Sequence, residues 1–316
     1  MSFEFSAPAK IILFGEHAVV YGQPAIAVPV SSVRVYAVAS LSECPGLRIL
    51  ARDLNQEISV TSSGEYSDQS PLAWVVGRTL REFGIPALSG EIDIRSEIPL
   101  ASGLGSGAAI SAVLVRSTAA LGGVLASDQL VNSLVFEAEG IYHGNPSGVD
   151  NTVIVFERGL FFRRKSPFVT MTMRNMYRFL IADTGVRAST KIAVDAVRRL
   201  YEQETGRVTP ILEEIGKITT EARMLLEDSE DHQKRLGRLM IQNHTLLQAL
   251  QVSSPELDRL TEAAVNAGAA GAKLSGGGMG GNMIALVDDS TRESVSRALI
   301  QAGAARVIYT TVGETG

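Results

Sequence analysis

Cysteine is almost missing from this chain, since Cys44 is the only one among 316 residues. A single cysteine cannot build an intramolecular disulfide framework, and it cannot supply a cysteine-based zinc site. The sequence therefore predicts a protein of a reducing compartment, and the cytoplasm is the expected location.

Long apolar runs and an excess of positive charge are also missing. No run approaches the roughly 20 residues that span a bilayer, and the first ten residues, MSFEFSAPAK, lack the basic and apolar regions of a signal peptide. The formal net charge is −5, with lysine and arginine dispersed along the chain, so no basic stripe favours nucleic acid. We expect a small-molecule substrate as partner, with no nucleic acid and no membrane.

The chain has apolar residues in abundance, at 45% hydrophobic and 20% charged, and its length favours two domains over one. The first half is dominated by β-branched stretches that predict strands, at residues 10–14, 25–30, 33–39, 90–98 and 152–156. Two helices are predicted among them, over 108–121 and over 129–139, the second capped by Ser127.

The second half begins with a predicted strand over 179–182 and then becomes mainly helical. Ser189, Thr209-Pro210 and Ser254-Pro255 each predict a helix start. A strand, glycine-rich turn, strand, helix and strand follow, at residues 272–274, 276–281, 283–287, 290–302 and 306–311. Strands that close through a tight turn indicate an α+β protein, and we place the domains at 1–172 and 173–316.

The strongest local signal is the glycine loop, residues 99–109, which reads PLASGLGSGAA and leads into an alanine-rich helix. Glycine permits positive φ, so successive backbone N–H groups can converge on an anion at the positive end of the helix dipole. A phosphate cradle and a simple packing turn are both open. The loop also partly fits the GxGxxA dinucleotide fingerprint, but no second strand ending in an acid follows about 20 residues later.

Three further stretches carry candidate chemistry. Residues 6–22, SAPAKIILFGEHAVVYG, place Lys10 at the start of an apolar strand and Glu16-His17 behind it. Residues 139–151, EGIYHGNPSGVDN, present Asp150 before a predicted strand, where a carboxylate could accept a hydroxyl proton. Residues 273–281, KLSGGGMGG, hold more glycine than a hairpin needs, which indicates close approach of the backbone to a ligand or another segment. Taken singly, each stretch also has a plainer interpretation: a solvated strand end for Lys10, a turn capped by its own aspartate for Asp150, and a loose hairpin for residues 273–281.

Together and in this order, the four stretches resemble the superfamily of galactokinase, homoserine kinase, mevalonate kinase and phosphomevalonate kinase, over almost the whole chain. GEHAVVYG and HGNPSGVDN are similar to the mevalonate kinases in particular. The resemblance implies an N-terminal domain like ribosomal protein S5 domain 2, a ferredoxin-like C-terminal domain and an active-site cleft between them.

The implied reaction is ATP-dependent phosphorylation of (R)-mevalonate to 5-phosphomevalonate, a step of isoprenoid biosynthesis, with Mg²⁺ as cofactor. A homodimer is also expected, because relatives are often dimers. The alternatives are a mevalonate 3-kinase, a phosphomevalonate kinase, an ATP-dependent decarboxylase of a mevalonate derivative, or a ligand sensor without catalysis on the same fold.

The resemblance also implies a role for each matching residue. Asp150 is the expected catalytic base, and Lys10 beside it steadies the transferred charge. Glu139 is the expected Mg²⁺ ligand, with Ser106 as its companion. The mevalonate-binding residues are Glu16, His17, Thr190 and Gly277, and the ATP-binding residues are Pro99, Ser102, Gly103, Leu104, Gly105, Ser106, Gly107 and Ala108.

The chain departs from the family pattern at three places. The usual APGK is here APAK, which keeps Lys10. The usual GLGSSAA is GLGSGAA, so Gly107 replaces the serine that normally touches the metal, and Ser106 or a water is expected in its place. In the last stretch Ser275 and Met279 stand where threonine and glycine are common.

Overall fold

A computed structural model describes residues 2–54, 56–61, 70–99, 103–143, 146–164, 166–187 and 189–313. The chain forms two compact units. Unit 1 consists of Met1–Ala9, Val33–Leu100 and Gly105–Glu157, and unit 2 consists of Lys10–Ser32, Ala101–Leu104 and Arg158–Gly316. The long strands β1 (Ser2–Phe14) and β2 (Pro24–Leu41) contribute residues to both units.

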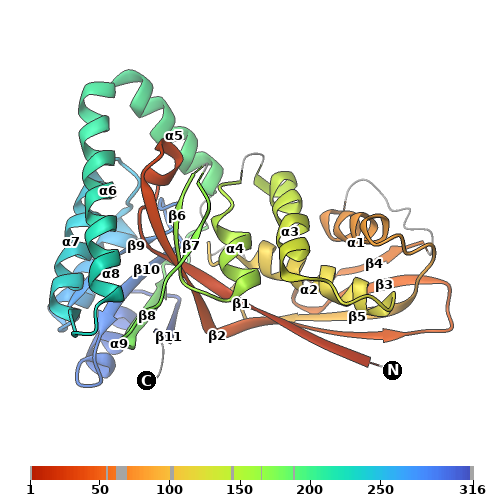
Figure 1. The fold of residues 1–316 in the computed structure, drawn as a ribbon. Helices are drawn as coiled ribbons and strands as arrows, with labels where there is room; N and C mark the ends of the chain where they lie inside the picture. The colour runs from red at the N-terminus through yellow and green to blue at the C-terminus, as the bar shows by residue number, and fades with distance from the viewer. Residues whose placement is uncertain are drawn as a thin grey trace. The chain divides into compact units, whose positions relative to one another are not determined.

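Unit 1 is a sheet with helices on one face (Figure 1). Its strands are β3 (Gly46–Ala51), β4 (Gln56–Val60), β5 (Ser89–Ser96) and the second half of β2, in the order β4-β3-β5-β2. Strands β3 and β5 are parallel and the other pairs are antiparallel. The short 3-10 helix η2 (Arg52–Leu54) joins β3 to β4, and α1 (Pro71–Glu82), α2 (Ser106–Leu121), α3 (Asp128–His143) and α4 (Val149–Phe156) complete the unit.

Unit 2 pairs the first half of β2 with β6 (Leu160–Arg163), and β6 with β7 (Val169–Thr170). Its second sheet contains β8 (Tyr177–Asp183), β9 (Gly271–Ser275), β10 (Asn282–Val287) and β11 (Arg306–Val312), all antiparallel, in the order β11-β8-β10-β9. With helices between β8 and β9 and between β10 and β11, this is the strand order of a ferredoxin-like sheet. The α+β prediction is confirmed.

The helices of unit 2 pack against this second sheet. They are η1 (Ala18–Tyr21), α5 (Thr190–Gln203), α6 (Thr205–Glu227), α7 (Gln233–Ala249), α8 (Pro255–Asn266) and α9 (Arg292–Gln301). Leu180 on β8 and Leu274 on β9 lie in one apolar core with Leu247 on α7 and Leu260 on α8. Within the described residues, none of the helices is long and apolar enough to cross a membrane.

Strand β9 lies unusually close to α7. A Cβ built on Gly237 of α7 would lie 2.0 Å from Ala270 O, and a Cβ built on Gly271 of β9 would lie 2.0 Å from Gly237 O. Real Cβ atoms do not approach other atoms this closely. The helix and the strand therefore touch backbone to backbone, which only glycine at both positions allows.

Several predicted helix starts are confirmed. The Ser189 hydroxyl accepts the N–H of Ile192 at the start of α5, and Ser254 does the same for Leu257 at the start of α8. Ser127 accepts the N–H of Leu130 and precedes α3. In each case the hydroxyl satisfies one of the N–H groups that a helix leaves unpaired in its first turn.

Two predictions of secondary structure are wrong. Residues 152–156 form the end of helix α4 and not a strand. Thr152 to Val155 are all buried, and a short run that is buried on all sides carries no period to separate helix from strand. Thr209-Pro210 is not a helix start, because α6 already begins at Thr205 and Pro210 lies inside it. The first turn of α6 is held by Val208, whose side chain is fully buried in the core of unit 2. Helix α1 had no counterpart among the predicted elements.

Candidate active site

The glycine loop ends at the start of α2, where the sequence predicts an anion site. Gly103 and Gly105 both have positive φ, 79° and 80°, and Gly105 is the N-cap of the helix. Among the described residues no side chain caps this end, so the first N–H groups, from Ser106 to Ala108, are free of a capping acceptor. Such a helix start attracts a phosphate through its N–H groups and its dipole.

The remaining residues predicted to bind ATP differ in their burial and in the atoms that they could offer to a ligand. Leu104 and Ala108 are buried apolar side chains, so they can offer only backbone atoms. Pro99 is half-buried, and it follows β5. Ser102 lies outside the described residues.

Glu139, the predicted metal ligand, lies beside this helix start within unit 1. It is buried on α3, and a Cβ built on Gly107 would lie 3.3 Å from Glu139 Oε1. The part of the chain that the structure describes holds no group of three or more His, Cys, Asp or Glu that could form a metal cage. Mg²⁺ characteristically needs only one or two carboxylates plus substrate phosphates, so the donor set fits.

Asp150 lies in the first turn of α4, also in unit 1. Gly148, with φ at 87°, turns the chain into the helix, and its carbonyl oxygen accepts the Thr152 hydroxyl at 2.6 Å. Asn151 Nδ2 donates to Asn132 Oδ1 at 2.7 Å, which ties the same turn to α3. Since α2, α3 and α4 pack on one another, Asp150, Glu139 and the glycine-loop helix all belong to one cluster of helices.

In unit 2 the strand that carries Lys10 meets the rest of the glycine loop. The N–H of Lys10 donates to Leu104 O at 2.9 Å, and the Lys10 side chain is buried. A Cβ built on Gly276 would lie 3.9 Å from Gly103 O. Strand β1, the glycine loop and the glycine turn, residues 276–281 between β9 and β10, are therefore neighbours although they lie far apart in the sequence.

Three of the four predicted acceptor residues are in contact in unit 2. His17 Nε2 donates to Gly277 O at 2.9 Å. A Cβ built on Gly277 would lie 3.1 Å from the Cα of Thr190, the first residue of α5. Glu16 is also near, but its carboxylate is buried in an ion pair with Lys273.

Both departures in the glycine-turn stretch are accommodated. The Ser275 hydroxyl donates to Ile12 O at 3.0 Å and accepts the N–H of Ile12 at 3.1 Å, so serine keeps the link to β1 that any hydroxyl residue could make. Met279 has φ at 58°, in the left-handed region that glycine adopts without strain. This backbone explains why glycine is common at that position.

Lys273 is the residue of this site that the sequence analysis passed over. It stands within the quoted glycine-turn stretch, yet no role was assigned to it. The available signal was its setting, because a lysine between Ala272 and Leu274 in an otherwise apolar strand must find a partner when the strand is buried.

The buried His17 predicts a pH dependence of stability. Burial lowers the pKa of His17 from 6.5 to about 4, although the hydrogen bond to Gly277 opposes the shift. The folded state therefore binds the proton less readily than the unfolded state, and this contribution is complete above pH 6.5 and is lost as the pH falls toward 4. We expect unfolding free energy to fall by up to about 3 kcal/mol through this window.

Urea titrations of the wild type and of His17→Gln between pH 4 and 7 would measure this dependence. The decline should be clearly shallower in His17→Gln. The same substitution at His232, which is partly exposed, is the control and should keep the decline. Parallel curves for wild type and His17→Gln would contradict the prediction.

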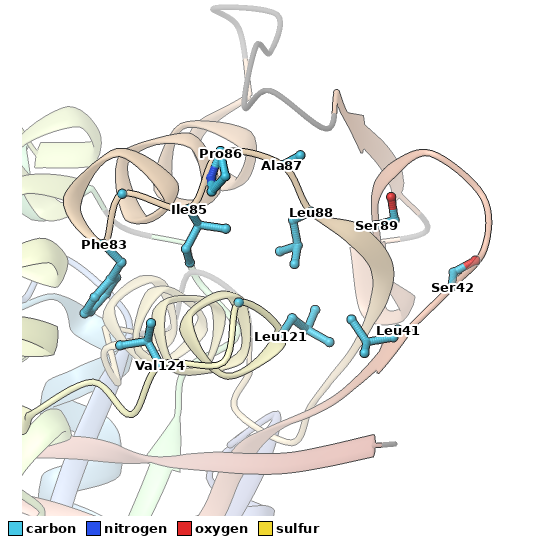
Figure 2. Close-up of a pocket in the computed structure, with 12 residues that line it drawn as sticks. Leu41, Ser42, Phe83, Ile85, Pro86, Ala87, Leu88, Ser89, Leu121 and Val124 are labelled. Atoms are coloured by element: carbon cyan, nitrogen blue, oxygen red, sulfur yellow. The ribbon is translucent and has the colours of Figure 1, made fainter.

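Unit 1 also contains a pocket of about 520 Å³, and none of these residues lines it (Figure 2). It is formed by the end of α1, the connection to β5, the end of α2 and the end of β2. Its side chains are mainly apolar, among them Leu41, Phe83, Ile85, Leu88 and Leu121. None of the residues predicted from the sequence lines it, and it contains no charged group, so it is not the candidate active site.

Comparison with known proteins places the fold and these stretches in one family. The family model described as GHMP kinases N terminal domain matches residues 70–159, and the one described as GHMP kinases C terminal matches residues 226–305. The chain belongs to the GHMP kinases. The dinucleotide interpretation of the glycine loop is wrong, because helix α3 follows α2 where a second strand would be needed.

Within that family the similarity is to mevalonate kinases. The mevalonate kinase of Pyrococcus horikoshii is 35% identical over 316 residues, with 94% of this chain and 92% of the relative covered. The L. major mevalonate kinase, solved in complex with R-mevalonate, superimposes with a TM-score of 0.86 at 26% identity, covering 99% of this chain and 97% of that one. The Methanococcus jannaschii mevalonate kinase gives 0.87 at 25% identity, covering 100% and 99%.

Proposed function

We propose that this enzyme transfers the γ-phosphoryl group of ATP to the 5-hydroxyl of (R)-mevalonate. The observation that carries the proposal is the likeness, over 99% of this chain, to a mevalonate kinase solved in complex with R-mevalonate. The contact among His17, Gly277 and Thr190 supports it, because these are the residues that the sequence analysis assigned to the acceptor.

The proposed chemistry follows from the demands of phosphoryl transfer. The acceptor oxygen bonds to the γ-phosphorus as the bond from that phosphorus to the β-γ bridging oxygen breaks, and negative charge spreads over the transferred group. The N-terminus of α2 holds the phosphates through backbone N–H groups. Glu139 and Ser106 would hold Mg²⁺, which, when bound, neutralises charge on the phosphates.

The acceptor side has two proposed participants. Asp150 accepts the proton of the 5-hydroxyl, for which its place in the first turn of α4 gives a fixed backbone. The Lys10 ammonium offsets the charge of the transferred group. Because the transition state is loose, positioning contributes more than a strongly basic group would.

The product identifies the reaction. The purified protein is incubated with Mg-ATP and ¹³C-labelled mevalonate, and the product is examined by phosphorus and carbon NMR. Coupling of phosphorus to C5 is the expected result. Coupling at C3 would favour a 3-kinase, turnover only with phosphomevalonate would favour a phosphomevalonate kinase, and ligand binding without turnover would favour a sensor.

Restoring the family serine at Gly107 should tighten the metal site. A Cβ built at this position would lie 3.3 Å from Glu139 Oε1, so a serine hydroxyl there can join the carboxylate. We expect Gly107→Ser to lower the Mg²⁺ concentration for half-maximal activity by roughly two- to tenfold, the worth of one hydrogen bond or ligand contact.

Gly107→Ala is the matched control, since it adds the same Cβ without the oxygen. Binding of Mn²⁺ in the presence of a non-hydrolysable ATP analogue, followed by electron paramagnetic resonance, gives a second measurement. Equal metal affinities for the serine and alanine variants would show that position 107 is remote from the metal.

A further inference from the structure

The pair formed by Lys273 and Glu16 is the most deeply buried charge pair among the described residues, since both side chains are 0% exposed. Lys273 Nζ donates to Glu16 Oε1 and, at 2.6 Å, to Leu274 O. Burial raises the pKa of the Glu16 carboxyl and lowers the pKa of the Lys273 ammonium, and the attraction between the two opposes both shifts. Isolated burial of either charge would be costly, so each requires the other.

Glu16 is shielded from any bound acceptor by this arrangement. Its Oε1 atom is occupied by Lys273, and its Oε2 atom is also hidden from solvent. A substrate could reach either oxygen only by displacing protein. Any influence of Glu16 on the acceptor pocket therefore passes through its neighbours, which are His17 in the chain and Lys10, whose charge acts on the Glu16 carboxyl, and not through direct contact.

The neighbour that matters is His17. The turn that carries both residues is strained at His17, whose φ of 59° and ψ of −45° are rarely adopted by a residue with a side chain, whereas Gly15 adopts its φ of 94° without strain. A residue held in such a sparsely populated backbone region costs on the order of 1–3 kcal/mol. Such a turn keeps its shape only when its surroundings fix it. The ion pair fixes it at Glu16, and the hydrogen bond to Gly277 fixes it at His17.

Lys273 also fixes the other side of the contact between His17 and Gly277. It lies on β9, the strand that leads into the glycine turn, at the edge of the second sheet. There the carbonyl oxygen of Leu274 accepts a hydrogen bond from Lys273 Nζ. The backbone N–H of Leu274 donates to His244 Nδ1 at 3.3 Å. The other ring nitrogen, Nε2, donates to Asp258 Oδ1 at 3.1 Å. The end of β9 is thus held by side chains before it enters the turn.

We infer that Lys273 is a positioning residue for the acceptor pocket, holding the Glu16-His17 turn and the glycine turn in register so that His17, Gly277 and Thr190 face one ligand. The inference rests on the proposed function for the identity of that ligand. The ion pair then has two roles: it contributes to folding stability, and it fixes the positions of the Glu16-His17 turn and the glycine turn.

The decisive variant removes the pair without leaving a buried charge. Replacing a buried ion pair by neutral side chains of similar size is often neutral for stability, whereas removing one partner is costly. Glu16→Gln combined with Lys273→Met is therefore expected to fold, at a cost of about 1–3 kcal/mol for the buried Leu274 carbonyl that loses its donor. We expect its KM for mevalonate to be raised at least roughly tenfold, because small misplacements in an active site carry such costs, while its KM for ATP is unchanged.

Comparing the KM values and the stability of the double variant with those of the wild type separates a positioning role from a role in stability alone. If the pair served stability alone, the folded double variant would show the wild-type KM for mevalonate, and this result would overturn the inference. Val295→Ala, a truncation in the core of unit 2 on α9, is the control for lost stability. It should lower the melting temperature and leave both KM values unchanged.

A second measurement does not need the double variant to fold or the substrate to be mevalonate. The imidazole resonances of His17, assigned by their loss in His17→Gln, are compared between wild type and Glu16→Gln. Displaced His17 resonances with unchanged His232 resonances are the expected result, and undisplaced His17 resonances contradict the inference. If the wild type fails to phosphorylate mevalonate, the proposed function fails, and these resonances still decide the role of the pair.

Discussion

Replacing Asp150 by asparagine is expected to lower kcat by about 10²- to 10⁴-fold, the usual contribution of a positioned general base. The amide keeps the size of the side chain but cannot take the hydroxyl proton. ATP binding should stay close to that of the wild type, because the N–H groups proposed to bind phosphate belong to α2 and Asp150 belongs to α4. Steady-state kinetics and calorimetric titration with an ATP analogue measure the two effects separately.

Asp128→Asn is the matched control for this variant. Asp128 is likewise an acid in the first turn of a helix of unit 1, but it is exposed and pairs with Arg116. The same chemical change there should leave kcat near the wild-type value. A near-normal kcat in Asp150→Asn would remove Asp150 from the role of base, and a parallel loss of ATP binding would point to a structural role.

Replacing Gly237 by alanine is expected to destabilise unit 2 by at least about 3 kcal/mol, at the upper end of the cost of overpacking. The new Cβ would lie 2.0 Å from Ala270 O, which is a backbone atom and cannot rotate away. Helix α7 and strand β9 would have to separate, although both contribute side chains to the core of unit 2. Denaturant unfolding followed by far-ultraviolet circular dichroism would measure the loss.

Gly206→Ala is the control, because Gly206 lies in helix α6 with nothing within 4 Å of a built Cβ. There the same substitution should be neutral or stabilising by up to about 1 kcal/mol, the difference in helix propensity. Equal stabilities of Gly237→Ala and wild type would show that α7 can shift away from β9 at little cost.

The sequence predicted those elements that carry their own local signal. Ser189 and Ser254 mark helix starts through a hydroxyl that accepts a nearby N–H, and the structure has both caps. Residues 152–156 carry no such signal, because Thr152 to Val155 are buried on every side in a helix that packs against α2 and α3. Whether a short apolar run is helix or strand is decided there by tertiary contacts that a local pattern does not contain.

In the candidate site, too, some features have a local signal in the sequence and others depend on tertiary contacts. The contact of His17 with Gly277 joins residues 260 positions apart, and the strongest indication of it in the sequence was the resemblance to a family. Lys273 had a signal of a purely physical kind, a charge within an apolar strand, but its partner could not be chosen among the many acids of the chain. The pair is fixed only when β9 and the end of β1 are brought together.

The side chains of Lys273 and His244, which bond the backbone of Leu274, also affect association between molecules. Strand β9 is an end strand of its sheet, and an end strand with open N–H and C=O groups can template pairing with another chain. At Leu274 both groups are already taken, by His244 and by Lys273. Intermolecular strand addition is thereby blocked at this position, and because every residue of β9 is buried, a chain that lost the lysine would leave one buried carbonyl without a partner.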